Sequence, residues 1–277
     1  MNIEQSKKLI GVLSVLLALS CAFSATLWIH GDYTSKVRKR LTCPSNKCEA
    51  IAPKVVFQKG QLMEQSFESK KEGAEKNTAY LCVGNSLTLH GKCDYWWGEW
   101  GMAASAPEND YFHQLGSLLA QDANVIGRGV NFSVWELNDH DRSEALQLLD
   151  PYLARGLDLI VLQVGENVTV FPTFEQDYVE LIEYVRAHCP EAKVVVMGQY
   201  RFNPGRQEAK INASAKTGVP FISLDDSQGG DFDGVIGTMV QGEDGQTHKI
   251  EHPGVAMHPG DKGMRTMAEK IYQEYSK

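Results

Sequence analysis

Three short polar motifs, far apart in the sequence, carry residue types that together could perform acyl transfer. A Gly-Asn-Ser motif ends at Ser86, a Gly-Glu-Asn motif ends at Asn167, and a His-Pro pair begins at His258. A serine hydroxyl becomes a nucleophile when a nearby imidazole accepts its proton, and a side-chain amide can donate a hydrogen bond to an oxyanion. Singly, each motif is ordinary for a loop. Their chemistry therefore depends on the elements that bring them together.

The segments around these motifs alternate between buried strands and amphipathic helices. Short apolar runs occur at residues 79–83, 124–130, 157–164, 193–199 and 220–224. Helical patterns occur at residues 108–121, 141–154, 174–185, 205–217 and 264–275. This alternation predicts a three-layer α/β/α sandwich with a central parallel five-stranded sheet. Ser86 and Asn167 follow the first and third strands, so both should lie at the carboxyl rim, where such sheets bind ligands.

At these motifs the chain resembles the SGNH/GDSL hydrolases, a family with a flavodoxin-like fold. Members have a nucleophilic serine in a Gly-Asp-Ser or Gly-Asn-Ser block after the first strand and an oxyanion glycine after the second. They also have a Gly-x-Asn block after the third strand and a His-Pro block before the last helix. The resemblance covers roughly residues 78–276, and the Gly-Met-Ala-Ala-Ser segment at residues 101–105 is similar to bacterial members.

The resemblance implies a role for each matching residue. Ser86 is expected to be the catalytic nucleophile and His258 its catalytic base. The backbone N–H groups of Ser86 and Gly129 and the side chain of Asn167 are expected to form the oxyanion hole. No cofactor is implied, and no catalytic metal is expected because the histidines lack metal-ligand spacing with cysteines or carboxylates.

The residue that orients the imidazole is left open by the sequence. The family usually has an aspartate three residues before the histidine, and Val255 occupies that position. The alternatives are a backbone carbonyl near Val255 or the carboxylate of Glu251, Asp226 or Asp261. A Ser–His dyad without the aspartate is workable but less strongly activated. A catalytically degenerate protein that binds or assembles glycans is therefore one alternative function.

Aromatic residues cluster just after the serine motif. Trp96, Trp97 and Trp100 either pack an insert onto the domain or form a platform on which a sugar ring stacks, and we expect them to bind substrate. The predicted function is an extracytoplasmic serine esterase that hydrolyses O-acyl esters, chiefly O-acetyl esters, on a cell-surface or secreted carbohydrate. An O-acetyltransferase would use the same chemistry of Ser86 and His258 and is the near alternative.

The N-terminal part differs from the rest in composition. Lys7 and Lys8 precede an uncharged apolar run at residues 9–29, long enough to cross a bilayer core of about 30 Å as a helix. We predict a cytoplasmic tail (1–8), a transmembrane signal anchor (9–29), a stalk (30–76) with local structure such as a short strand at 55–57, and a hydrolase-like domain (77–277). This places the domain outside the cell membrane. Secretion after signal cleavage is the alternative, and basic residues at 36–40 argue against the orientation.

Charge and cysteine content narrow the partners. The formal net charge of -8 does not favour nucleic-acid binding. The expected partners are an acylated carbohydrate or other small ester and, through the N-terminal helix, the membrane. In an oxidising compartment either Cys43 and Cys48 or Cys82 and Cys93 could form a disulfide. For Cys82 and Cys189, the other interpretation is burial as small apolar side chains.

Overall fold

The structure is a computed structural model that describes residues 55–277. The predicted cytoplasmic tail, the transmembrane anchor at 9–29, most of the predicted stalk, and the pair Cys43 and Cys48 lie outside the described residues. Within residues 55–277, no helix combines the length and the apolarity needed to span a membrane.

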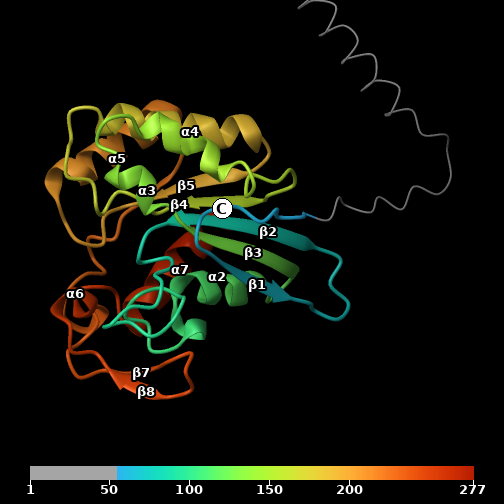
Figure 1. The fold of residues 1–277 in the computed structure, drawn as a ribbon. Helices are drawn as coiled ribbons and strands as arrows, with labels where there is room; N and C mark the ends of the chain where they lie inside the picture. Colours follow the sequence, from blue (N-terminus) through green and yellow to red (C-terminus); the bar gives the residue numbers. More distant parts are fainter. Residues whose placement is uncertain (1–54) are drawn as a thin grey trace, which may run out of the picture. The chain divides into compact units, whose positions relative to one another are not determined.

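A six-stranded, mostly parallel sheet runs through the domain (Figure 1). Its strands are β1 (Glu64–Ser69), β2 (Asn77–Gly84), β3 (Asn124–Asn131), β4 (Leu159–Leu162), β5 (Lys193–Met197) and β6 (Phe221–Ile222). They lie in the order β1-β3-β2-β4-β5-β6, and only the β1–β3 pair is antiparallel. The five predicted parallel strands are therefore confirmed. Because β2 lies between β3 and β4, the carboxyl end of β2 is the switch point at which such sheets bind ligands.

The sixth strand corrects the predicted stalk. β1 pairs with β3 along its whole length, from Glu64 opposite Val130 to Ser69 opposite Val125. Val55 is buried in the core, and residues 55–57 form no strand. The domain therefore begins before residue 77, by residue 55 at the latest. β1 was missed because an edge strand with one solvent-exposed face has the polar composition expected of a linker.

Helices cover both faces of the sheet. The α-helices are α2 (Tyr111–Leu119), α3 (Ser133–Leu137), α4 (Phe174–His188), α5 (Pro204–Thr217), α6 (Pro253–Ala256) and α7 (Asp261–Tyr275). The 3-10 helices are η1 (Pro107–Asn109), η2 (Arg142–Leu149) and η3 (Gly230–Phe232). In Figure 1, α4 and α5 lie on one side of the sheet, and α2 and α7 lie on the other. Along β2, Ala79, Leu81 and Val83 pack toward the first side, while Tyr80 and Cys82 pack toward the second. The predicted three-layer arrangement follows from this alternation.

An insertion lies between β6 and α7. The predicted turn at residues 243–246 joins a hairpin of β7 (Met239–Gln241) and β8 (Thr247–Lys249). Val240 and Ile250 are buried in the same cluster as Val255, which belongs to α6. The hairpin therefore packs onto the domain and fixes the segment that leads to His258.

Three cysteines belong to the described part of the chain. Cys82, Cys93 and Cys189 are all free thiols, so of the interpretations left open for Cys82 a disulfide with Cys93 is not the one found. Cys82 is fully buried in β2 and Cys189 is buried after α4, as expected of small apolar side chains.

Candidate active site

Ser86 lies on a tight turn directly after β2. The Asn85 carbonyl accepts hydrogen bonds from the N–H groups of Thr88 and Leu89, both at 2.9 Å, so the chain turns sharply at the serine. Gly84 is required here, because a Cβ at this position would lie 1.8 Å from the Thr88 hydroxyl oxygen. The turn leaves Ser86 partly exposed while its neighbours on both sides are buried.

His258 meets Ser86 from the opposite end of the sequence. It lies in the short loop between α6 and α7, and its Nε2 is 2.8 Å from the Ser86 Oγ. Its Nδ1 lies 2.8 Å from the carbonyl oxygen of Gly254. Because a carbonyl only accepts hydrogen bonds, Nδ1 must carry the proton and Nε2 is the free acceptor. The Ser86 hydroxyl therefore donates to Nε2, as a nucleophile does to its general base.

The Gly254 carbonyl answers the question raised by Val255, whose side chain is buried in the core. A backbone carbonyl near Val255 was one of the two alternatives. The carboxylates of the other alternative have partners elsewhere: Glu251 with Lys249, Asp226 with Lys270, and Asp261 with Ser105. The imidazole is thus oriented by a neutral dipole rather than by a charge.

The surroundings of His258 keep its ring neutral. Burial lowers its pKa from 6.5 to about 4, and the electrostatic effects of His90 and Arg201 act in the same direction. The hydrogen bond to the Gly254 carbonyl opposes this shift. A neutral imidazole can accept the serine proton, so the base is in its competent form across the physiological pH range.

Asn167 lies on the same rim, held by a carboxylate that sequence reasoning missed. The Asn167 Nδ2 donates to Glu136 Oε2 at 2.6 Å. The fully buried Glu136 also accepts hydrogen bonds from the Asn85 side chain at 2.9 Å and from the Gly165 backbone N–H. An amide nitrogen carries two hydrogens, so Asn167 retains one for an oxyanion. Glu136 joins the loops that carry Ser86 and Asn167, and an acidic residue in the short apolar helix α3 was its only sequence signal.

Of the predicted oxyanion donors, the structure supports some and contradicts one. The Ser86 N–H has no hydrogen-bond acceptor within residues 55–277 and is available. Gly129 is wrong as a donor, because it lies inside β3 with Gln65 and Cys82 opposite it in the two flanking strands. Beyond β3, the Phe132 N–H already donates to the Gly84 carbonyl at 2.6 Å. The structure therefore supplies two candidate donors, the Ser86 N–H and the Asn167 amide.

The predicted tryptophan platform is also wrong. Trp96 and Trp100 are buried in the core, 0% and 3% exposed, and pack edge to face. Trp97 is partly exposed, but it stacks on His248 of β8 with ring centroids 4.4 Å apart. None of the three lines the pocket at Ser86. They attach the loop after the serine turn to the domain and to the hairpin.

The pocket at Ser86 has a volume of about 260 Å³. It is lined by Ser86, Leu87, Glu166, Asn167, Tyr200, Arg201, Phe202, Asn203, Arg206, Met257 and His258. Glu166 accepts hydrogen bonds from the backbone N–H groups of Tyr200 at 2.7 Å and Arg201 at 3.4 Å, and burial raises its pKa to about 7. A pocket of this volume has room for a short acyl group together with one ring of an alcohol.

A buried cation lies behind this rim. Lys210 of α5 is 0% exposed, and its Nζ donates to the backbone carbonyls of Val164 at 2.9 Å and Gln163 at 3.4 Å. Burial lowers its pKa to about 8, against the opposing effects of Glu166 and Glu136. Lys210 therefore fixes the carboxyl end of β4, from which the chain continues to Asn167.

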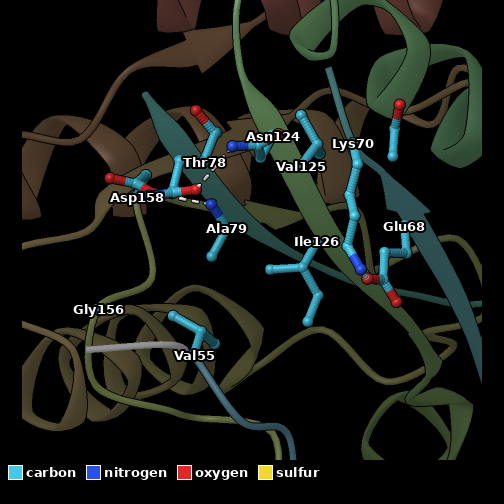
Figure 2. A pocket seen from close by; sticks show the side chains of 12 residues that line it. Val55, Glu68, Lys70, Thr78, Ala79, Asn124, Val125, Ile126, Gly156 and Asp158 are labelled. Carbon is cyan, nitrogen blue, oxygen red and sulfur yellow. Dashed lines mark hydrogen bonds and ion pairs between the residues drawn. The ribbon is translucent and has the colours of Figure 1, made fainter. Parts of the chain in front are cut away.

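A second cavity, of about 440 Å³, lies at the amino ends of β2 and β3, at the edge of the sheet opposite Ser86 (Figure 2). Its charged groups already have partners. Asp158 accepts from the Ala79 N–H at 2.7 Å, and Lys70 pairs with Glu68 at 3.5 Å. It contains no nucleophile with a neighbouring base. Within residues 55–277, no cluster of three or more His, Cys, Asp or Glu side chains could hold a metal ion.

Comparison with known proteins gives weak similarities. No family model matches the chain. No curated protein matches it either. Similar solved structures include a salicylyl acyltransferase from a tetracycline biosynthetic pathway (17% identity, TM-score 0.45, covering 75% of this chain and 57% of that one). A family two carbohydrate esterase from Cellvibrio japonicus is 16% identical, with a TM-score of 0.44, covering 71% and 60%. An extracellular lipase from Streptomyces rimosus is 12% identical, with a TM-score of 0.44, covering 70% and 99%.

The chain thus spans less than two thirds of the acyltransferase and of the carbohydrate esterase. These proteins are of the ester-cleaving and acyl-transferring class that the sequence motifs resemble. With TM-scores below 0.5, the similarities carry no argument about the activity of this chain, which has to be argued from the geometry of the site.

Proposed function

We propose that this protein is a serine esterase that hydrolyses short O-acyl esters, chiefly O-acetyl esters, with Ser86 as nucleophile and His258 as general base. The observation that carries the proposal is the 2.8 Å contact between Ser86 Oγ and His258 Nε2, with the opposite ring nitrogen held by a carbonyl. This arrangement fixes both the position and the tautomer of the base.

The reaction proceeds in two halves. Ser86 Oγ attacks the ester carbonyl carbon while His258 Nε2 accepts the hydroxyl proton, and the resulting oxyanion receives hydrogen bonds from the Ser86 N–H and the Asn167 amide. The imidazolium then protonates the departing alcohol, leaving an acyl-serine. A water molecule, deprotonated by the same nitrogen, attacks that ester and releases the acid.

The carbohydrate substrate and the extracytoplasmic location are further parts of the proposal. They are supported by the apolar run at residues 9–29, which would anchor the domain at a cell surface. The tryptophans no longer support a sugar substrate, because they lie away from the pocket. The location can be tested with a reporter enzyme that is active only outside the cytoplasm, fused after Lys277. An inactive fusion would contradict the proposed orientation.

Covalent labelling tests the chemistry. A fluorophosphonate should label the full chain, and Ser86→Ala should abolish the label, because only an activated serine is phosphonylated. Ser117→Ala, at an exposed position on α2, is the matched control and should label like the wild type. Absence of label on well-folded wild-type protein would favour a glycan-binding protein, and label persisting in Ser86→Ala would place the nucleophile elsewhere.

A further inference from the structure

The pocket at Ser86 is lined by two arginines that have no acidic partner. Arg201 and Arg206 both line it, and neither forms an ion pair with a carboxylate within residues 55–277. Arg128, Arg142 and Arg265 each lie within 4.0 Å of a carboxylate. Arg155 and Arg186 also form no ion pair with a carboxylate of the described residues, but neither lines this pocket. In a chain with a formal net charge of -8, two unpaired guanidinium groups beside the nucleophile make the pocket locally positive.

Each arginine is held in place by one backbone carbonyl and keeps donors free. Arg201 Nη1 donates to the Met257 carbonyl at 2.9 Å, next to His258. Arg206 Nε donates to the Val168 carbonyl at 2.8 Å, next to Asn167, and its guanidinium lies over the Phe171 ring. A guanidinium has five N–H donors, so most remain unused in both residues. One charge is therefore anchored next to His258 and the other next to Asn167.

The one carboxylate of the pocket does not pair with either guanidinium group. Glu166 accepts hydrogen bonds from the backbone N–H groups of Tyr200 and Arg201 rather than from a guanidinium. The cation that lowers the pKa of Glu166 is Lys210, which is buried behind the rim. The arginine side chains thus have free donors toward the pocket, and such donors are best matched by the paired oxygens of a carboxylate or phosphate.

Resting on the proposed esterase activity, we infer that the substrate carries an anionic group, a carboxylate or a phosphate, close to the ester, and that Arg201 and Arg206 bind it. The pocket volume of about 260 Å³ limits the distance between the ester and the anionic group, so both are expected as substituents of one small ring. An O-acetylated acidic sugar has this chemistry, with the ester and the charged group on the same ring.

The test compares esters that differ only in charge. The full chain is assayed with 3-acetoxybenzoate and with its neutral isostere 3-acetoxybenzamide, and 3-acetoxyphenyl phosphate distinguishes a phosphate from a carboxylate site. We expect kcat/KM for the preferred anion to exceed that for the amide by about tenfold or more, and the ratio to fall as salt is raised. Arg201→Gln and Arg206→Gln should each move the ratio toward one. The matched control Arg155→Gln, exposed and remote from the pocket, should leave the ratio unchanged.

Binding separates this inference from the proposed activity. The non-hydrolysable amide 3-acetamidobenzoate should bind the full chain about tenfold more tightly than 3-acetamidobenzamide, and Arg201→Gln should remove the difference. An anion preference in binding without hydrolysis would sustain the inference and end the esterase proposal. Equal binding and equal hydrolysis of the charged and neutral probes, or a preference that survives both substitutions, would overturn the inference while leaving the esterase intact.

Discussion

Replacing Glu136 by glutamine perturbs the oxyanion side of the site while leaving Ser86 and His258 in place. Glu136 Oε1 accepts from the Asn85 amide and the Gly165 N–H, and Oε2 accepts from Asn167 Nδ2 at 2.6 Å. Glutamine has the same shape but only one acceptor oxygen. If that oxygen keeps the two donors on the Oε1 side, the new NH2 group faces the NH2 of Asn167, and the Asn167 amide must turn away.

The expected size of the effect follows from the hydrogen bonds that are lost when the Asn167 amide rotates. Loss of one oxyanion donor costs about 10²–10³ in kcat. The loss of a charged acceptor also destabilises the fold, by about 1.5–3 kcal/mol per hydrogen bond. Asn167 is only partly buried, so water can replace its partner and the low end applies. We therefore expect kcat for 3-acetoxybenzamide to fall at least about a hundredfold in Glu136→Gln while the fold survives.

Steady-state kinetics and thermal unfolding of the full chain measure the two effects together. Because a lost donor acts only on the transition state, kcat should fall while KM changes little. Glu144→Gln, at an exposed position in η2, is the matched control and should resemble the wild type in both assays. A folded Glu136→Gln protein with kcat within threefold of the wild type would refute the role of the Asn167 amide as an oxyanion donor positioned by Glu136.

Three other expectations follow from buried groups. Because the pKa of His258 is lowered to about 4, kcat/KM should be level between about pH 5 and 8 and should fall tenfold per pH unit below pH 4. The free energy of unfolding should decrease as the pH falls from 6.5 to 4, because in this range the unfolded chain binds more protons than the folded one. Lys210→Met should lower the free energy of unfolding in urea by roughly 3 kcal/mol, and adding Glu166→Gln should restore part of it. Trp96→Ala should cost about 3–5 kcal/mol in the same assay, whereas Trp97→Ala should cost less than about 1 kcal/mol and hydrolyse esters at the wild-type rate.

Local patterns predicted the sheet and brought two distant residues together. Continuous apolar runs with helical patterns between them require parallel strands, and parallel strands place their carboxyl ends on one rim. Ser86 and Asn167 follow directly from that geometry, because each comes just after such a run. His258 follows less directly, since its approach depends on the insertion at residues 228–257, whose packing no local pattern specifies. Its position before the last helix favoured the same rim, and the resemblance to a known family predicted that it would act as the base of Ser86.

The incorrect predictions have physical reasons. Trp96 and Trp100 were assigned to substrate because an aromatic cluster beside a nucleophile fits either a platform or a core, and only tertiary contacts distinguish the two. Gly129 was expected to follow the second parallel strand but lies inside β3, because the end of a strand is not sharply encoded when apolar residues continue past it. Glu136 could not be found, since a buried carboxylate is recognised by the donors around it, and its donors come from loops distant in sequence.

The charges around Ser86 and His258 connect the missing aspartate of the dyad with the two arginines of the pocket. In a complete triad an aspartate stabilises the imidazolium that forms during acyl transfer, and the Gly254 carbonyl does this less well. Burial and the Arg201 guanidinium oppose the imidazolium further, as the pKa of His258 near 4 reflects. An anionic group bound by Arg201 would offset that positive charge and make His258 a stronger base when substrate is present. The substrate would then supply the negative charge that Val255 cannot, so that the dyad becomes fully basic only with an acidic ester in the pocket.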